Sequence, residues 1–220
     1  MTGQELADLP FADALTTFGG PWRPDETYDT IHVDGGAIEG GTVHNVDAAQ
    51  ARFLECAFTQ VTLDGGSLRR ARLNEVWLRE VRLVATDLAE GEWLDVTFLD
   101  AVLAGTEAYG AELQRVVFRG CKLDSLNFRE AALTDVRFEN CVLRDVDFGG
   151  AKLVRVAFPG CRLSETDLTG VTLTKVDLRG AELGITGGLE SLRGAIVSTA
   201  QLVDLAPFIA QSIGLTVKDD

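Results

Sequence analysis

Cysteine and histidine are the residues of this 220-residue chain best suited to metal binding or nucleophilic chemistry. Cys121, Cys141 and Cys161 recur at an interval of twenty residues, which could align their thiols as a metal or redox ladder. Side chains at equivalent places in a repeating fold point the same way rather than at one another, and no histidine is near them in the sequence. We therefore expect these cysteines, and Cys56, to pack as small apolar core residues.

The histidines and glycine pairs do not predict a catalytic or phosphate-binding site. His32 and His44 are far from any serine or cysteine in a nucleophile-like setting. The glycine pairs at 35–36, 40–41 and 65–66 precede neither a helix nor a Gly-Lys-Ser/Thr ending. They fit the corners or the small inward positions of a repeating fold. The sequence thus predicts no enzyme, no cofactor and no metal site.

Carboxylates provide a different kind of candidate site, one that would bind a partner protein. No lysine or arginine occurs between Arg82 and Arg115, and we name the seven acidic residues there the acidic belt: Asp87, Glu90, Glu92, Asp95, Asp100, Glu107 and Glu112. Two interpretations stay open, a partner-binding surface or a solvated face. Aspartate just before a repeat centre, as at Asp87, also fits a role in capping corner backbone.

Outward apolar residues accompany the acidic belt and could form a contact surface. They are Trp77, Val84, Leu94, Leu99, Val102 and Tyr109. Among them we predict Trp77, Leu94 and Leu99 as partner-binding residues. The alternative is that the chain's own N-terminal segment packs there.

A five-residue period positions all of these side chains. Centres that are mostly Leu or Phe recur every five positions from Val33 to Leu183, which neither an alternating strand nor an amphipathic helix produces. Grouping by twenty aligns Phe98, Phe118 and Phe138 in one column and Leu123 and Leu143 in another. A square coil of four pentapeptides explains that sorting. We expect nearly eight coils at a spacing of about 4.8 Å, around a core without an internal hole.

The pentapeptides resemble those of the pentapeptide-repeat family. Thr166-Asp-Leu168 and Val176-Asp-Leu178 show its pattern of a small residue, Asp and a central Leu. The resemblance implies an all-β solenoid, a right-handed quadrilateral β-helix. The fluoroquinolone-resistance (Qnr-type) members of the family dimerise through C-terminal modules and act on DNA gyrase as acidic mimics of duplex DNA. This chain departs from them in its N-terminal extension and in the basic residues of its rod.

Two non-repeat ends flank the predicted β-helix of residues 31–183. Residues 1–30 are expected to cover the open end of the first coil, and residues 184–220 to form a helical capping and dimerisation module. Ser198 and Gln201 have capping-box spacing, Pro207 is expected to split the module into two short helices, Gly214 to stop it, and 215–217 to form a strand. The candidate dimer interface is Leu202, Leu205, Phe208, Ile209 and Ile213.

Composition narrows the class of function. A net charge of −14, from 34 acidic and 20 basic residues, argues against direct binding to nucleic-acid phosphates. The sequence shows no membrane segment or basic apolar leader, so a cytoplasmic protein is expected. We predict a non-catalytic, homodimeric interaction rod that engages DNA gyrase or another type II topoisomerase through DNA mimicry. The alternative is a scaffold for an unrelated partner.

Overall fold

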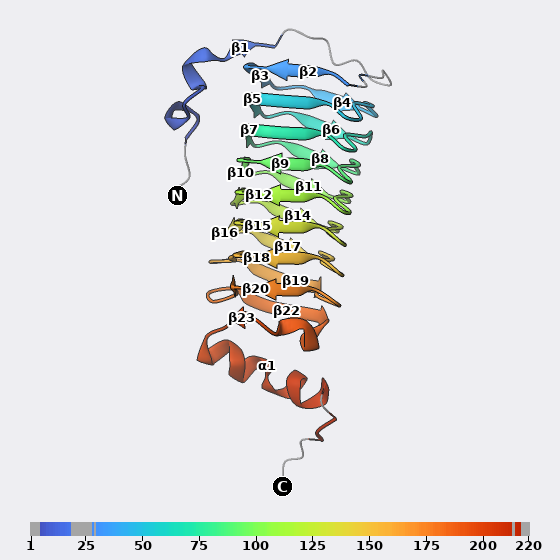
Figure 1. The fold of residues 1–220 in the computed structure, drawn as a ribbon, viewed down its shortest axis with the longest axis vertical. Coiled ribbons are helices and arrows are strands. Elements are labelled where there is room, and N and C mark those ends of the chain that lie inside the picture. The colour runs from blue at the N-terminus through green and yellow to red at the C-terminus, as the bar shows by residue number, and fades with distance from the viewer. Residues whose placement is uncertain (1–4, 19–27, 29, 213, 217–220) are drawn as a thin grey trace.

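The computed structural model of the chain describes residues 5–18, 28, 30–212 and 214–216. It is a parallel β-solenoid of about nine turns that ends in one α-helix (Figure 1). Strands pair with their equivalents twenty residues away, as Phe98 does with Leu78 and Phe118. The twenty-residue coil predicted from the sequence is therefore confirmed. Among the described residues, no helix has the length and apolar character needed to span a bilayer.

Two adjacent sides of the rod form one thirteen-stranded sheet. Side 1 is centred on residues such as Leu73, Trp93 and Leu113, and contains β2 (His32–Asp34), β5 (Arg52–Thr59), β7 (Arg72–Arg79), β9 (Glu92–Leu94), β12 (Glu112–Gln114), β15 (Ala132–Thr134), β18 (Lys152–Val154) and β20 (Thr172–Thr174). Strands β5 and β7 continue around a corner into side 2, which is centred on Phe58, Leu78 and Phe98. Side 2 also contains β1 (Thr16–Thr17), β3 (Gly36–Glu39), β10 (Thr97–Leu99), β13 (Val117–Arg119) and β16 (Arg137–Glu139), and β21 (Val176–Asp177) pairs with β23 (Ala195–Ile196) below it.

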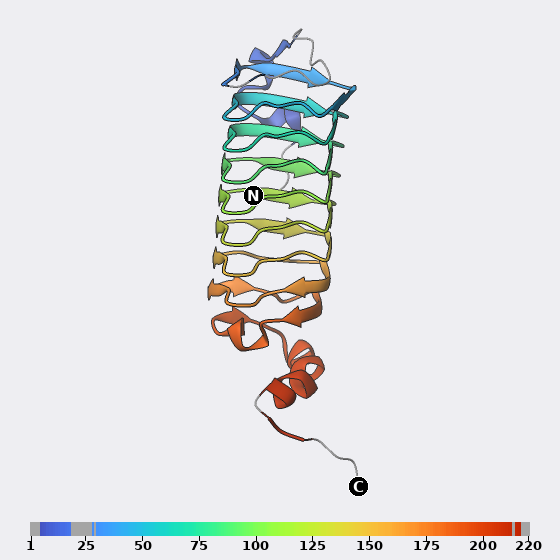
Figure 2. The ribbon, with the colours of Figure 1, turned by 90° about the vertical axis from the view of Figure 1, so that its right-hand side faces the viewer.

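The other two sides complete the coil, and Figure 2 turns the rod by 90° so that the right-hand side of Figure 1 faces the viewer. Side 3 is an eight-stranded sheet of β4 (Thr42–His44), β6 (Thr62–Asp64), β8 (Arg82–Val84), β11 (Val102–Ala104), β14 (Lys122–Asp124), β17 (Val142–Arg144), β19 (Arg162–Asp167) and β22 (Glu182–Gly187). Side 4 has isolated bridges instead of a sheet, in the column that runs from Asp47 through Asp87 and Glu107 to Asp167. Side-chain oxygens in this column accept a hydrogen bond from the backbone N–H two residues later. For example, Asp87 accepts from the N–H of Ala89 at 2.9 Å. The capping role predicted for aspartate before the centre is confirmed at Asp87.

Each corner residue takes a left-handed backbone conformation, which explains the paired glycines. Gly65 occupies a corner with φ +74°, and the following Gly66 takes the inward position with φ +86°. A Cβ on Gly66 would lie 2.1 Å from the carbonyl oxygen of Val46, so only glycine fits there. The corners and inward positions predicted for these glycines are confirmed.

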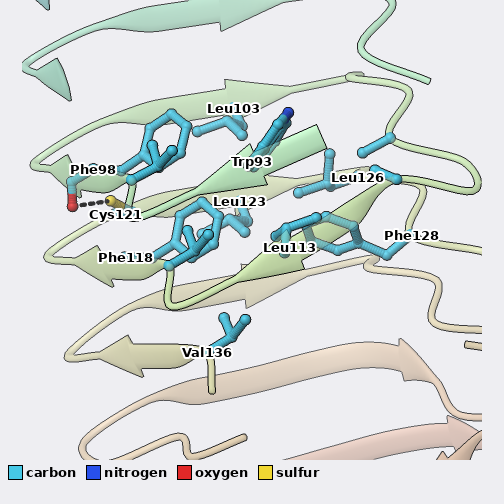
Figure 3. Close-up of a cluster of buried hydrophobic side chains, with 14 of the residues drawn as sticks. Trp93, Phe98, Leu103, Leu113, Phe118, Cys121, Leu123, Leu126, Phe128 and Val136 are labelled. Atoms are coloured by element: carbon cyan, nitrogen blue, oxygen red, sulfur yellow. Dashed lines mark hydrogen bonds between the residues drawn. The ribbon is translucent and has the colours of Figure 1, made fainter. Parts of the chain in front are cut away.

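Stacked side chains fill the core (Figure 3). The rings of Phe98, Phe118, Phe138 and Phe158 stack in one column at centroid distances of 4.8 to 4.9 Å. That distance is the spacing between coils, so the repeat itself sets the ring contact. Towards the N-terminal end the same column holds Leu78, and an apolar cavity of about 50 Å³ remains there among valines, leucines and a few aromatic rings. The prediction of a core without a hole is therefore wrong for these coils, because their mixed side chains do not stack as regularly as the phenylalanines and leave space inside the square.

The N-terminal segment covers an outer face as well as the first coil. Strand β1 pairs with β3 and so extends side 2 by one rung. Before it, η1 (Leu6–Asp8) and η2 (Ala12–Ala14) lie along the flank of the rod (Figure 1). We name residues 5–15 the strap. Its Leu6, Leu9 and Leu15 pack on Ala57, Trp77 and Leu99 of side 2.

The C-terminal module is one helix, α1 (Thr199–Ser212), preceded by η3 (Leu189–Leu192). The predicted break at Pro207 is wrong: the proline removes one N–H donor, but the helix continues past it. The helix stop at Gly214 is confirmed, with φ +79° and an N–H donated to the carbonyl of Gln211. Residues 215 and 216 form no strand, contrary to expectation, and Val217 is outside the described residues.

Candidate partner-binding surfaces

The acidic belt winds around the rod instead of forming one patch. Glu92 and Glu112 lie in register on side 1, and Asp87 and Glu107 in register on side 4, as predicted. Glu90, Asp95 and Asp100 occupy three successive corners of a single coil, so Glu90 and Asp100 are on diagonally opposite edges of the square. No single flat partner could contact all seven residues at once.

Arginines one coil away neutralise four members of the acidic belt. Glu90 pairs with Arg69 and Arg70, and Asp87 is 3.8 Å from Arg69. Glu92 accepts a hydrogen bond of 3.1 Å from Arg72. These bases lie about one coil before the acids, beyond the stretch that appeared free of positive charge in the sequence.

Asp95 has the most regular of these pairs. Its two carboxylate oxygens accept hydrogen bonds of 2.6 and 2.7 Å from Nε and Nη2 of Arg115, one coil later. The same bidentate relation recurs between Asp135 and Arg155. Hydrogen bonding to Arg70 lowers the pKa of Glu90, and hydrogen bonding to Arg155 lowers that of Asp135. Charge alternation at an interval of twenty residues is the signal that could have revealed these pairs in the sequence.

Three members of the acidic belt have no basic partner among the described residues. Glu107 accepts a hydrogen bond of 2.6 Å from the side-chain amide of Asn127. Asp100 and Glu112 accept none from any described side chain, and both are exposed. Asp100 and Glu112 are therefore the carboxylates of the acidic belt most available to a basic side chain of a partner protein.

The predicted apolar contact surface is mostly covered. Trp77 and Leu99 are only 2% and 8% exposed because the strap lies on them, so the expectation that they face solvent is wrong. Leu94 lies on side 1 and is half-buried. Tyr109 is exposed on side 4, where its hydroxyl donates to Glu130 at 2.6 Å. The open alternative, packing by the N-terminal segment, is what the structure shows.

Helix α1 presents most of its apolar residues to solvent. Leu202, Val203 and Phe208 are 51%, 66% and 54% exposed. Leu205 is buried within the C-terminal module, where α1 packs on η3, so it is not exposed to a second copy. Ile209 is half-buried, and Ile213 is outside the described residues.

Gln201 joins α1 to the last coil, a role that the sequence analysis did not assign. Its Oε1 accepts from the N–H of Ser198 at 2.9 Å and the Ser198 hydroxyl accepts from the N–H of Gln201 at 3.2 Å, which confirms the predicted capping box. The Gln201 amide also donates to the carbonyls of Leu178 and Ala181. The carbonyl of Leu178 also accepts from the N–H of Ala181 at 3.2 Å, whereas that of Ala181 has Gln201 as its donor at the edge of the terminal coil.

The four cysteines are core residues, as predicted. All are buried and free, and the thiols of Cys121, Cys141 and Cys161 donate to the carbonyls of Phe98, Phe118 and Phe138. The neighbouring Cys121 thiol, together with burial, raises the pKa of Cys141 to about 12, far from that of a reactive thiolate. Within the described part of the chain, no three His, Cys, Asp or Glu side chains gather as metal ligands.

Comparison with known proteins supports the fold. Residues 111–186 match the family model described as pentapeptide repeat region. The solved structure of a trypsin-treated variant of QnrB1, a plasmid-mediated fluoroquinolone resistance protein, superimposes with a TM-score of 0.68 at 18% identity, over 86% of this chain and 100% of that one. Full-length QnrB1 gives a TM-score of 0.47 at 17% identity over 86% and 100% of the two chains. A pentapeptide repeat protein of the Arabidopsis thaliana thylakoid lumen gives 0.38 at 13% identity over 55% and 71%.

No curated protein matches this sequence. Three observations agree on its fold: the repeat-region match, the register of twenty residues and the superposition on QnrB1. The chain therefore contains a pentapeptide repeat region at residues 111–186, and its rod has the fold of QnrB1.

Proposed function

We propose that this protein is a non-catalytic interaction rod that works as a homodimer and binds a type II topoisomerase. The observation that carries the proposal is the combination of a QnrB1-like rod with an apolar helix exposed at its end. The rod supplies a rigid charged surface, and the helix supplies an apolar one.

The dimer part of the proposal rests on α1. Leu202, Val203 and Phe208 are large apolar side chains at least half exposed on one short helix. A second copy related by a two-fold axis would present the same residues and cover them mutually. Phe208 is the natural anchor, since aromatic residues contribute most to such contacts.

Light scattering coupled to size exclusion tests the dimer. The wild-type chain is expected at twice the monomer mass, and Phe208→Asp at the monomer mass. Val142→Asp is the matched control, because Val142 is also an exposed apolar residue but lies mid-rod on side 3. A wild-type monomer, or an equal effect of both variants, would contradict this part.

The topoisomerase part rests on fold and charge. QnrB1 is described as a fluoroquinolone resistance protein, and this chain has its fold together with a net charge of −14. An acidic rod can occupy a basic surface built for duplex DNA. Glu90, Glu92 and Asp95 are already paired with arginines, so we assign the contacts to Asp100 and Glu112. These two carboxylates lie near opposite edges of the square, so the partner surface would enclose the rod and not meet a single side.

A gyrase assay tests this part. The purified protein is expected to change DNA supercoiling by gyrase or its quinolone sensitivity, and Asp100→Lys with Glu112→Lys should weaken that effect. Glu39→Lys is the matched control, an exposed acidic residue of the first coil without a described partner. Unchanged gyrase activity across a wide protein range would contradict a topoisomerase target and favour a scaffold for an unrelated partner.

A further inference from the structure

A polar pocket of about 290 Å³ opens where side 4 turns into side 1. Six side chains of three successive coils line it, two from each coil: Gln50 and Arg52, Arg70 and Arg72, Glu90 and Glu92. Arg52, Arg72 and Glu92 are in register along side 1. The six side chains therefore form three rows about 4.8 Å apart.

The first two rows of this pocket break the charge alternation of the rod. Several arginines of the rod face an acid twenty residues away, as in Asp95 with Arg115 and Arg162 with Glu182. Arg72 has Glu92 on one side but Arg52 on the other. Arg52 has no ion-pair partner among the described residues, so the pocket contains three guanidinium groups and two carboxylates.

The acidic row holds two of these guanidinium groups in place. Nε of Arg70 donates to Glu90 at 2.7 Å, and Nη2 of Arg72 donates to Glu92 at 3.1 Å. Each guanidinium group has five N–H donors, so further donors stay available on the side that faces Gln50 and Arg52. The Gln50 amide adds another donor to that row.

We propose that this pocket binds an oxyanion, a phosphate or carboxylate group, between the rows of Arg52 and Arg72. Arg52 and Arg72 are stacked without a carboxylate between them. The bound anion would supply that negative charge and so reduce the repulsion between the two guanidinium groups. Arginine suits this ligand because its planar fork matches two oxygens of phosphate or carboxylate. The ligand is either a small phosphorylated compound or an acidic side chain of a partner protein.

Binding can be measured on the full-length protein by NMR with inorganic phosphate and acetate as probes. Chloride keeps the ionic strength constant, because screening alone weakens exposed charges. We expect saturable shifts confined to the amides of residues 50–53 and 70–73. Saturation by phosphate alone identifies a phosphorylated ligand, and saturation by both probes identifies carboxylate as well. Shifts that never saturate, or that spread over all arginines, would overturn the proposal.

Two variants of Arg52 make the test specific. Arg52→Gln should weaken phosphate binding about tenfold or more, the loss expected for one charged hydrogen-bonding group. Arg52→Glu supplies the missing acid to Arg72, and should both abolish binding and raise the melting temperature. Arg82→Gln is the matched control, an exposed arginine on side 3 without an ion pair among the described residues, and should bind as the wild type does. Equal losses in Arg52→Gln and Arg82→Gln would show that general charge, not this pocket, attracts the anion.

Discussion

The side-chain amide of Gln201 donates a hydrogen bond of 2.6 Å to the carbonyl oxygen of Leu178, which joins the terminal helix to the last coil of the β-helix. A second bond of 2.7 Å reaches the carbonyl of Ala181. A parallel β-helix has an unpaired backbone edge at each end, and such an edge invites pairing with another chain. Gln201 supplies the donors that a further coil would have supplied.

Gln201→Ala should therefore lower the stability of the C-terminal coils. The carbonyl of Ala181 loses its partner, whereas that of Leu178 keeps the N–H of Ala181, so the free energy of unfolding should fall by roughly 1 to 3 kcal/mol. Denaturant unfolding and hydrogen exchange of the amides near residues 178–183 measure the loss. Gln211→Ala, an exposed glutamine on the same helix, is the control and should change neither quantity. Equal stability of both variants would show that the two bonds contribute nothing net.

Leu9→Asp should release the strap from side 2. A carboxylate beside the indole of Trp77 would lose its hydration, which is unfavourable. We therefore expect the strap to detach and the Trp77 side chain to become exposed to water. Trp77 fluorescence should shift to the red and become accessible to acrylamide. The measurement uses a Trp22→Phe background, in which Trp93 stays in the core at 2% exposure. Adding Trp77→Phe should remove the change, and a shift that persists there would place its origin elsewhere.

Val46→Ile should stabilise the rod by filling the apolar cavity. Val46 lines the cavity, and one added methylene contributes up to about 0.8 kcal/mol when it enters empty apolar space. Val146 has the same place in the coil five turns later but is fully buried in packed core. Val146→Ile should destabilise the protein by about 1 to 3 kcal/mol through overpacking. Melting temperatures of the two variants that move in the same direction would contradict this difference in packing.

Acid should weaken the rod through Glu139. Its partial burial raises the pKa, but hydrogen bonds from Arg137 and Arg119 outweigh that effect and leave the pKa below the usual 4.5. A carboxyl with a depressed pKa in the folded state contributes stability that is complete above its unfolded pKa and is lost as pH falls through the folded value. Stability should therefore decline below about pH 4.5.

Glu139→Gln provides the test of that acid sensitivity. The variant should unfold more easily at pH 7 and show a shallower decline of unfolding free energy between about pH 4.5 and 3. Arg119→Gln removes one of the two arginines and should give an intermediate slope. Identical pH profiles for wild type and Glu139→Gln would contradict a depressed pKa in the folded protein.

The sequence by itself determined the coil. The twenty-residue sorting of Phe98, Phe118 and Phe138 requires equivalent side chains to stack, and the buried cysteines and paired glycines follow from the same register. Local patterns also determined the Ser198 and Gln201 capping box and the stop at Gly214, because these depend on neighbours along the chain.

The tertiary structure alone decided what lies on the surface. Inward positions repeat, so one coil predicts the next, whereas outward residues differ between coils and their partners are twenty residues away or in the strap. Arg70 and Glu90 form an ion pair across coils, and Leu9 of the non-repeating strap covers Trp77. Arg52 and Arg72 lie in register with no carboxylate between them. Such contacts depend on which side chains stack across coils or fold back from the ends, and a local stretch of sequence does not reveal them.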